Sequence, residues 1–582
     1  MSPQANPSAS RRLLLPLAAC FAATVASAAL PGQVPNRRAS SDSGQNAAND
    51  DSLTRPHVSA TGRYVVFSSD ASNLVPGDTN GWHDVFVKDF GTGLTDRLSL
   101  GPNGAQGNDR SSEPRITSDG RWVVYSSRAT TLSPFDQNHL SDVYVADRIA
   151  QTTTLVSTNH LGVVGADGAS FRPSISDDGR YVAFASQATN LIPGGDANGF
   201  TDVYVKDTLT GATRLCSRNA QGQPANGHSR NPRISRSGQF VVFDSEADDL
   251  VANDGNGRRD VFVFDLTTDA VWRSSLGPNG AEPDGDCTAL DIDAFGQHVL
   301  FESFASNLVA GQSGLDVYVS DAIGSFVECV NVDSGGTIGN GASLSGALSG
   351  DGRFVAFTTR ASDLFAGDGN GSLEDVAVRD RVALTTERAS IALDGGSPNG
   401  ACRWPSISDD GRFVAYVSAA PNLLFGKTDL VDDVIRADVN PPVTATASIG
   451  GPGCAGTAGL SALQNAPGSL PWIGFDLHLV GDHVPAWFGV LFVGTSNALY
   501  QGLPLPLPLD AVGMPGCTLY TSAELSLVVV ADAMGDYAAA VPIPDDANLR
   551  GLELFAQSFL FDPGANAFGG VLSNGLDLVI GG

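Results

Sequence analysis

The sequence has few positive charges, few histidines and little that could cross a membrane. Its 582 residues include 34 Lys and Arg against 63 Asp and Glu, so the formal net charge is −29. Such a surface repels phosphate backbones and anionic lipid headgroups, which argues against nucleic-acid binding and is more compatible with a cationic partner or calcium. Only 17% of the residues are charged and Gly is abundant, which indicates a turn-rich β protein rather than a disordered chain.

The sequence also lacks a recognisable catalytic constellation. A G-x-S-x-G nucleophile elbow is absent, and the eight histidines show no metal-ligand spacing. Asp and Glu are numerous, but none is singled out as an acid with a raised pKa. Local motifs therefore do not identify a function, and the internal repeats are the more informative feature of the sequence.

One stretch, FRPSISDDGRYVAFASQATNLIPGGDANGFTDVYVKD at residues 171–207, recurs with substitutions seven times. The glycine of its S-x-D-G-R turn falls at nearly constant intervals, at Gly62, Gly120, Gly179, Gly238, Gly296, Gly352 and Gly411. A period of this size indicates an array or a propeller. Each copy contains four short β-like segments, so the pattern predicts seven four-stranded blades around one axis.

The repeated motif resembles the TolB-like propeller repeat, a WD-like family with the pattern S-x-D-G-R-x-(I/V)-A-F…D-(I/V)-Y-V-x-D. Copies three, six and seven match it best, with SDDGRYVAF, SGDGRFVAF and SDDGRFVAY, while the fifth has FGQHVLF and no arginine. The resemblance implies a seven-bladed β-propeller and suggests a role at the cell envelope. Since propellers host many functions, it identifies the fold better than the activity.

Composition divides the chain into a leader, a propeller, a linker and a C-terminal module. Residues 1–28 have a basic start, an apolar core and a small-residue cleavage site, so we expect export to the periplasm or the cell exterior. Cys20 sits in a sequence resembling a lipoprotein box, but only seven apolar residues precede it, and soluble export is preferred. Residues 37–440 are the expected propeller, 441–450 a proline-bearing linker, and 451–582 a small β-sandwich that resembles a C-terminal module of exported planctomycete proteins. No segment after the leader could span a membrane.

Residues 37–54 resemble the end of a repeat without its first three strands. Arg38-Ala-Ser40 corresponds to the outer strands at residues 97–100 and 388–391, and the seventh copy has only three strands of its own. The N-terminal strand is therefore predicted to complete the last blade and close the ring, which removes an exposed sheet edge.

A D-x-N-G-x-x-D motif precedes the third strand of several copies. Its members are Asp78, Asn80 and Asp84; Asp196, Asn198 and Asp202; and Asp254, Asn256 and Asp260. Oxygen ligands on a tight loop suit calcium, but the full ligand set of a calcium loop is not visible. The preferred interpretation is that Asn-Gly makes a turn while the last Asp bonds to nearby backbone amides. No catalytic residue and no other cofactor is predicted.

Chain direction places the D-G-R and T-G turns on one face of the propeller and the long loops on the other. The arginine of D-G-R is expected to form a structural salt bridge. Binding residues gather on long loops, so the long-loop face and the mouth of the central channel are the predicted site. We expect a non-enzymatic scaffold that binds an unidentified protein or glycan there; the alternative is a polysaccharide-active lyase or hydrolase at the channel mouth.

Cysteines add one expectation. Cys454 and Cys517 share a Pro-Gly-Cys context and are the best candidates for a disulfide. Equivalent positions two blades apart cannot approach closely enough to pair, and this applies to Cys216 with Cys329 and to Cys287 with Cys402.

Overall fold

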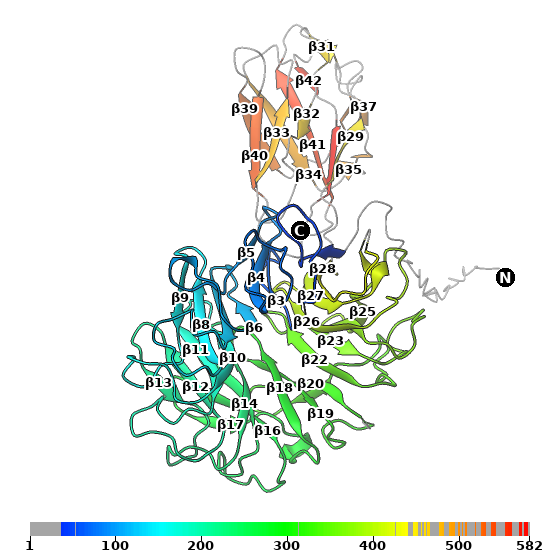
Figure 1. Ribbon diagram of the computed structural model, residues 1–582. Helices are drawn as coiled ribbons and strands as arrows, with labels where there is room; N and C mark the ends of the chain where they lie inside the picture. The colour runs from blue at the N-terminus through cyan, green and yellow to red at the C-terminus, as the bar shows by residue number, and fades with distance from the viewer. Residues whose placement is uncertain are drawn as a thin grey trace, which may run out of the picture.

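The computed structural model describes residues 36–439, apart from residues 53, 312–313 and 425–426, together with the strands between residues 446 and 579. The first part is a ring of seven four-stranded antiparallel sheets, so the predicted seven-bladed propeller is confirmed (Figure 1). The leader expected at residues 1–28 lies outside the described residues.

Blades one to four contain, in order from the channel outward, the strands β2 (His57–Val58), β3 (Tyr64–Ser69), β4 (Asp84–Asp89) and β5 (Thr95–Arg97); β6 (Ser111–Ile116), β7 (Trp122–Ser127), β8 (Asp142–Asp147) and β9 (Thr152–Leu155); β10 (Ser170–Ile175), β11 (Tyr181–Ser186), β12 (Asp202–Asp207) and β13 (Thr213–Leu215); and β14 (Ser229–Ile234), β15 (Phe240–Ser245), β16 (Asp260–Asp265) and β17 (Val271–Arg273).

Blades five to seven contain β18 (Cys287–Ile292), β19 (His298–Ser303), β20 (Asp316–Asp321) and β21 (Val327–Cys329); β22 (Ser343–Leu348), β23 (Phe354–Thr359), β24 (Asp375–Asp380) and β25 (Thr385–Arg388); and β26 (Cys402–Ile407), β27 (Phe413–Ser418), β28 (Asp433–Asp438) and β1 (Asn36–Arg38). Three short 3-10 turns, η1 (Pro102–Gly104), η2 (Pro278–Gly280) and η3 (Pro421–Leu423), lie in the loops. No helix among the described residues is long and apolar enough to cross a bilayer.

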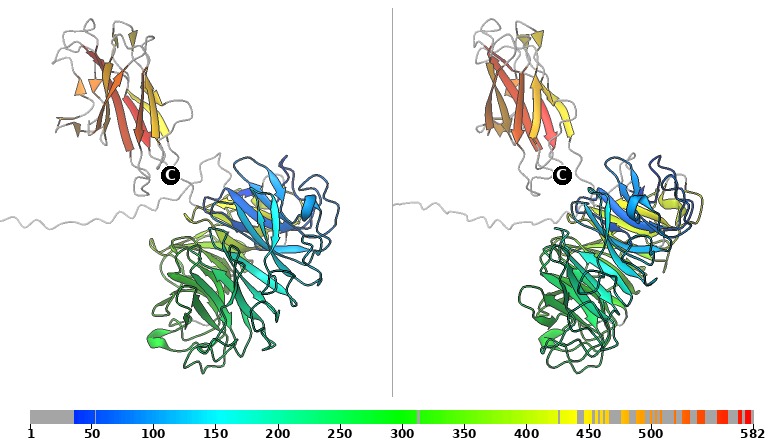
Figure 2. Two further views of the ribbon diagram at one scale, coloured as in Figure 1. Left: turned by 90° about the vertical axis from the view of Figure 1, so that its left-hand side faces the viewer. Right: turned by 60° about the vertical axis from the view of Figure 1, so that its left-hand side comes forward.

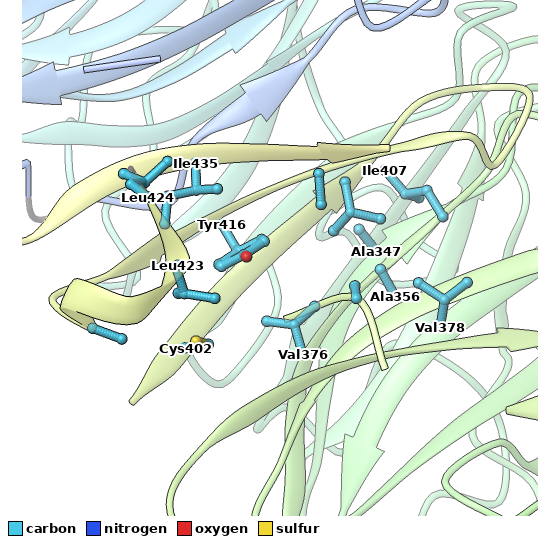
Figure 3. Close-up of a cluster of buried hydrophobic side chains, with 14 residues drawn as sticks. Ala347, Ala356, Val376, Val378, Cys402, Ile407, Tyr416, Leu423, Leu424 and Ile435 are labelled. Carbon is cyan, nitrogen blue, oxygen red and sulfur yellow. The ribbon is translucent and has the colours of Figure 1, made fainter. Parts of the chain in front are cut away.

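The second and third strands of each blade are buried on both faces. In β3 every residue after Tyr64 is buried, and all six residues of β4 are buried. Neighbouring blades cover both faces, which explains the near-continuous apolar runs in the sequence. Figure 3 shows such an interface: Val376 and Val378 of blade six share one buried cluster with Tyr416 and Leu423 of blade seven.

Each blade turns back on itself at a D-G-R glycine that also contacts the preceding blade. Gly179 has a φ of +72°, and a Cβ there would lie 2.5 Å from the Trp122 indole nitrogen in blade two. Gly62 stands in the same relation to Phe413, so blade one packs on blade seven as the other blades pack on their predecessors. Glycine is required both for the left-handed backbone and for the close contact.

The N-terminal strand β1 is the outer strand of blade seven. It pairs with β28 in antiparallel register, with Asn36 opposite Ala437 and Arg38 opposite Ile435 (Figure 1). The Ser40 hydroxyl donates a 2.6 Å hydrogen bond to Asp433 Oδ1. The ring is therefore closed by segments almost 400 positions apart in sequence, and the closing strand begins at Asn36, one residue before the predicted range.

The strands after residue 445 form a separate set of antiparallel sheets. One sheet contains β29 (Thr446–Gly451), β43 (Gly575–Val579), β41 (Glu553–Phe561), β34 (Phe488–Gly494), β39 (Leu525–Val530) and β42 (Gly570–Leu572); another contains β32 (Leu463–Asn465), β33 (Asp476–Gly481) and β40 (Tyr537–Pro542). Three short pairs join β30 (Ala455–Gly456) to β31 (Gly459–Leu460), β35 (Leu499–Tyr500) to β36 (Leu503–Pro504), and β37 (Leu507–Pro508) to β38 (Thr518–Leu519). This all-β composition agrees with the predicted sandwich, although β29 begins inside the range expected to be linker. Cys454 and Cys517 lie outside the described residues.

Candidate functional site: the central channel

Three rings of residues from the seven inner strands surround the propeller axis. The rim ring lies seven positions before each D-G-R glycine and comprises Arg55, Glu113, Arg172, Asn231, Ala289, Ser345 and Trp404. The middle ring lies five positions before it and comprises His57, Arg115, Ser174, Arg233, Asp291, Ala347 and Ser406. The base ring lies two positions before it and comprises Ala60, Ser118, Asp177, Arg236, Ala294, Gly350 and Asp409.

A β-bulge turns the rim ring towards the channel mouth. The strand register shifts near this point in six inner strands, and in five of them the rim residue has a positive φ: Glu113, Arg172, Asn231, Ser345 and Trp404. Bulges re-aim side chains and are over-represented next to functional sites. All seven rim residues border one cavity of about 590 Å³ on the long-loop side.

The channel is bridged at its other end. Backbone hydrogen bonds of 3.0–3.2 Å join base-ring residues of neighbouring blades: Ala60 to Ser118, Asp177 to Arg236, Ala294 to Gly350, Gly350 to Asp409 and Asp409 to Ala60. The Arg236 guanidinium also reaches across the axis from blade four, forming an ion pair with Asp409 of blade seven and a hydrogen bond with Ser118 of blade two. The channel therefore has a bridged base, and we call its cavity on the long-loop side the cup.

Arginine dominates the charge of this cup. The cavity is bordered by five arginines, Arg55, Arg115, Arg172, Arg233 and Arg259, but by only two acidic residues, Glu113 and Glu302. Burial is the largest cause that lowers the pKa of Arg55, to about 10, and it is followed by repulsion from Arg115. Burial likewise lowers the pKa of Arg115 and, strongly, that of Arg233.

The one histidine in the cup is held neutral. His57 Nδ1 accepts a 3.3 Å hydrogen bond from the Ile116 amide, which leaves the proton on Nε2. Burial and then the charge of Arg115 place the pKa of His57 well below its usual value. His57 can accordingly donate a hydrogen bond from Nε2 without adding charge.

The predicted D-x-N-G residues lie in the loops before β4, β12 and β16, with the last Asp as the first residue of each strand, and they do not border the cup. Asn80 Nδ2 donates a 2.9 Å hydrogen bond to Asp84 Oδ2, and Asn80 Oδ1 of the same side chain accepts one from the Trp82 backbone amide. Arg97 of the fourth strand lies between two carboxylates, 2.9 Å from Asp78 and 3.2 Å from Asp84. Arg273 has the same position between Asp254 and Asp260.

The last Asp of the motif does not bond as expected. In the described residues its carboxylate accepts hydrogen bonds from side chains, and the expected backbone amides are not among its donors. In every blade a hydroxyl or amide two residues after the end of the fourth strand donates to this Asp: Ser99, Ser157, Ser217, Ser275, Asn331, Ser390 and Ser40. The donor comes from a different segment of the blade, which is why the loop sequence alone did not reveal it.

Blade three lacks the fourth-strand arginine, because Leu215 stands in its place. The Tyr204 hydroxyl donates to Asp196, and Asn198 Nδ2 donates a 2.6 Å hydrogen bond to Asp202. Burial, opposed by the Ser217 hydrogen bond and reinforced by the neighbouring Asp196, raises the pKa of Asp202. No group of three or more His, Cys, Asp or Glu side chains arranged to hold a metal is found in the described part of the chain.

The D-G-R arginines serve the scaffold, as predicted. Arg180 forms two hydrogen bonds with the Asp207 carboxylate, at 3.1 and 2.8 Å, and its guanidinium lies 4.7 Å from the centre of the Tyr181 ring. The same pair occurs in blades one, two, six and seven. Each of these arginines therefore joins the turn to the end of the third strand of its own blade.

Two further surface features are candidates for a binding site. A larger hollow of about 800 Å³ lies between the outer strands β5 and β9, but it is a groove between two adjacent blades where side chains of only those blades meet. The long loops between the second and third strands also carry exposed apolar side chains: Trp82, Leu140, Phe200, Leu373 and Leu430. These residues lie on the same face as the cup mouth.

The fold and the cup identify the described part of the protein as a seven-bladed β-propeller with an axial pocket on its long-loop face. No protein-family model matches the sequence, and no curated protein matches it. Solved structures with a similar fold include an oligogalacturonate lyase in complex with manganese, with 12% identity over 67% of this chain and 89% of that one and a TM-score of 0.40.

Two TolB structures are also similar. TolB from Acinetobacter baumannii has 18% identity over 66% of this chain and 81% of its own, with a TM-score of 0.32. A putative TolB from Agrobacterium tumefaciens has 16% identity over 49% of this chain and 81% of its own, with a TM-score of 0.31. These are likenesses of fold.

Proposed function

We propose that the protein is an exported, non-enzymatic binding propeller that takes up part of a protein or glycan ligand at the mouth of the central cup. The observation that carries the proposal is the cavity of about 590 Å³ bordered by residues from all seven inner strands. Its volume lies in the range of ligand pockets, which are typically about 300–1,000 Å³.

The surroundings of the mouth support a large ligand. Trp404 provides an aromatic surface at the rim, with Arg403 packed 5.3 Å from the ring centre. The exposed apolar residues of the long loops, such as Trp82 and Leu430, surround the same face and suit contacts with a protein or the flat faces of sugars.

The test is a binding screen of glycan and peptide arrays with residues 29–582 and two matched variants. Trp404→Ala alters the rim, whereas Phe295→Ala removes an exposed aromatic ring from the tight-turn face. We expect hits that the first variant loses and the second keeps. Equal binding by both variants would show that the ligand docks elsewhere.

The alternative remains a polysaccharide-active lyase or hydrolase with its site at the same mouth. Glu113 and Glu302 are the carboxylates that border the cavity, and His57 lies below them. Product analysis of acidic and neutral polysaccharides would favour this alternative if turnover occurs and is abolished by Glu113→Gln or Glu302→Gln.

Calcium binding stays a prediction for blade three alone. Arg97 and Arg273 already supply positive charge between the paired carboxylates of blades one and four, so those loops do not fit a second cation. Melting in chelator and in millimolar calcium tests blade three: a calcium-dependent rise that Asp202→Asn removes would establish the ion, and identical melts would favour the turn.

A further inference from the structure

The charge of the cup is opposite to that of the chain. Acidic residues outnumber basic ones by 63 to 34 in the sequence, yet five arginines and two glutamates border the cavity. Arginine is the side chain best suited to bind carboxylates and phosphates, because its planar fork offers two parallel donors. A local excess of positive charge on an otherwise acidic protein indicates a negatively charged ligand.

Two of these arginines make no direct polar contact in the described part of the protein. The side chains of Arg55 and Arg115 form neither a hydrogen bond nor an ion pair with any described residue, whereas Arg233 donates to the Leu290 and Pro232 carbonyl oxygens. Unpaired charge in a confined space is costly, and here the like charges also repel one another.

The neighbouring carboxylates are already engaged. Glu302 Oε2 accepts a 2.9 Å hydrogen bond from the Ser345 amide. Asp291 uses one oxygen for the Ile292 amide and the other for the Leu348 amide, both at 3.1 Å. Glu113 faces Arg172, at 3.8 Å. These acids stabilise the bulged backbone and moderate the field of the arginines without forming an ion pair with Arg55 or Arg115.

We propose that the cup binds a small oxyanion with two or more negative charges, held by Arg55 and Arg115 and assisted by Arg233. The inference rests on the proposed function for the location of the site and adds the chemical class of the ligand. The cavity of about 590 Å³ and its bridged base suit a small molecule or the charged end of a longer one. Carboxylates and phosphates share the required chemistry.

The experiment compares citrate and pyrophosphate with uncharged glucose, using calorimetry and thermal melts at low ionic strength. The variants are Arg55→Gln, Arg115→Gln and, as a matched control, Arg128→Gln, which removes an exposed arginine from a long loop outside the cavity. Loss of one charge-assisted pair should weaken binding about ten-fold to a hundred-fold. The first two variants should also melt at the same temperature as the native protein or higher, because a repelling charge is gone.

Binding of citrate alone would identify carboxylates, binding of pyrophosphate alone would identify phosphates, and either outcome supports the proposal. No binding of either anion at about 10 mM would overturn it, since that limit corresponds to less than about 3 kcal/mol. Equal losses of anion affinity in Arg128→Gln and Arg115→Gln would also overturn the proposal. If both anions fail while array ligands still depend on Trp404, the ligand class is wrong and the proposed site stands; if Trp404→Ala changes nothing, the site is wrong.

Discussion

At the scale of single residues, several blades bury carboxylates that depend on one arginine as their counterion. Arg273 is the clearest case, because its guanidinium contacts Asp254, Asp260 and Glu282 at 2.9–3.2 Å. Its side chain is 7% exposed. Such a cluster contributes little beyond what apolar packing would, but breaking it leaves uncompensated charge.

Replacing Arg273 by Leu should therefore destabilise the propeller by about 3–5 kcal/mol near neutral pH, since the buried carboxylates lose their counterion. The loss should be smaller at pH 5, where Asp254, whose pKa is raised to about 6 mainly by burial, becomes protonated. Urea unfolding at pH 5 and pH 8 measures both effects. Exposed Arg258→Leu is the control, and an equal loss in the control would contradict the explanation.

The dependence of stability on pH should have two limbs. Hydrogen bonds from Arg180 hold the pKa of Asp207 at about 2, so this carboxylate adds stability above its ordinary pKa and loses it as the pH falls. Burial raises the pKa of Asp142 to about 7 and also raises that of Asp202. A raised carboxyl pKa has the opposite sign: stability is lost as the pH rises from about 4 towards 7.

Replacing Asp202 by Asn should make the loss of stability between about pH 4 and pH 7 less steep, because the neutral amide cannot be forced to ionise while Asp142 still can. Melting temperatures measured from pH 4 to pH 9 check this, with exposed Glu387→Gln as the control. A native-like fall between pH 5 and pH 8 in the Asp202 variant would show that another group controls this limb.

At the scale of the strand and turn, glycine has two separable roles within blade three. Gly179 and Gly199 both have positive φ, at +72° and +81°, but only Gly179 contacts a ring of the preceding blade. Alanine at Gly199 should cost about 1–2 kcal/mol for the left-handed backbone alone.

Alanine at Gly179 should cost about 1–3 kcal/mol more, because Trp122 would have to move. Chemical unfolding of the two variants gives the difference, and equal losses would contradict the packing role. Only one of the two roles could be predicted from the sequence. The turn is local and was predicted, whereas the contact with Trp122 joins residues 57 positions apart.

The same distinction explains what the sequence revealed of the candidate site. Strands, turns and blade number depend on short-range patterns that repeat seven times, so they could be predicted. The arginine cup could not, because each copy contributes one or two side chains and Arg55, Arg115 and Arg233 lie in three different copies. An alignment of the seven copies on the turn glycine would have shown the signal. The positions five and seven residues before that glycine hold the side chains that line the channel, including Arg55, Arg115 and Arg233.

At the scale of the whole molecule, ring closure depends on β1. Removing residues 36–54 deletes the pairing with β28 and the Ser40 hydrogen bond to Asp433. We expect a fall of several degrees in melting temperature and a tendency to associate through the exposed edge of β28.

A peptide of residues 36–54 added in trans should restore much of the lost stability, which distinguishes a missing strand from general damage. Calorimetry with and without the peptide measures the effect. An unchanged melt after the deletion would rule out a closing role.

The pairing of Ser40 with Asp433 also sets the order of events during synthesis. The two residues are 393 positions apart, so the first blade segment to leave the ribosome waits for the last. At synthesis rates of about 5–20 residues per second this interval is roughly 20–80 s. During that time blades one to six can fold on one another while the N-terminal strand remains without its partner, and completion of the ring is the last step of the propeller's biogenesis.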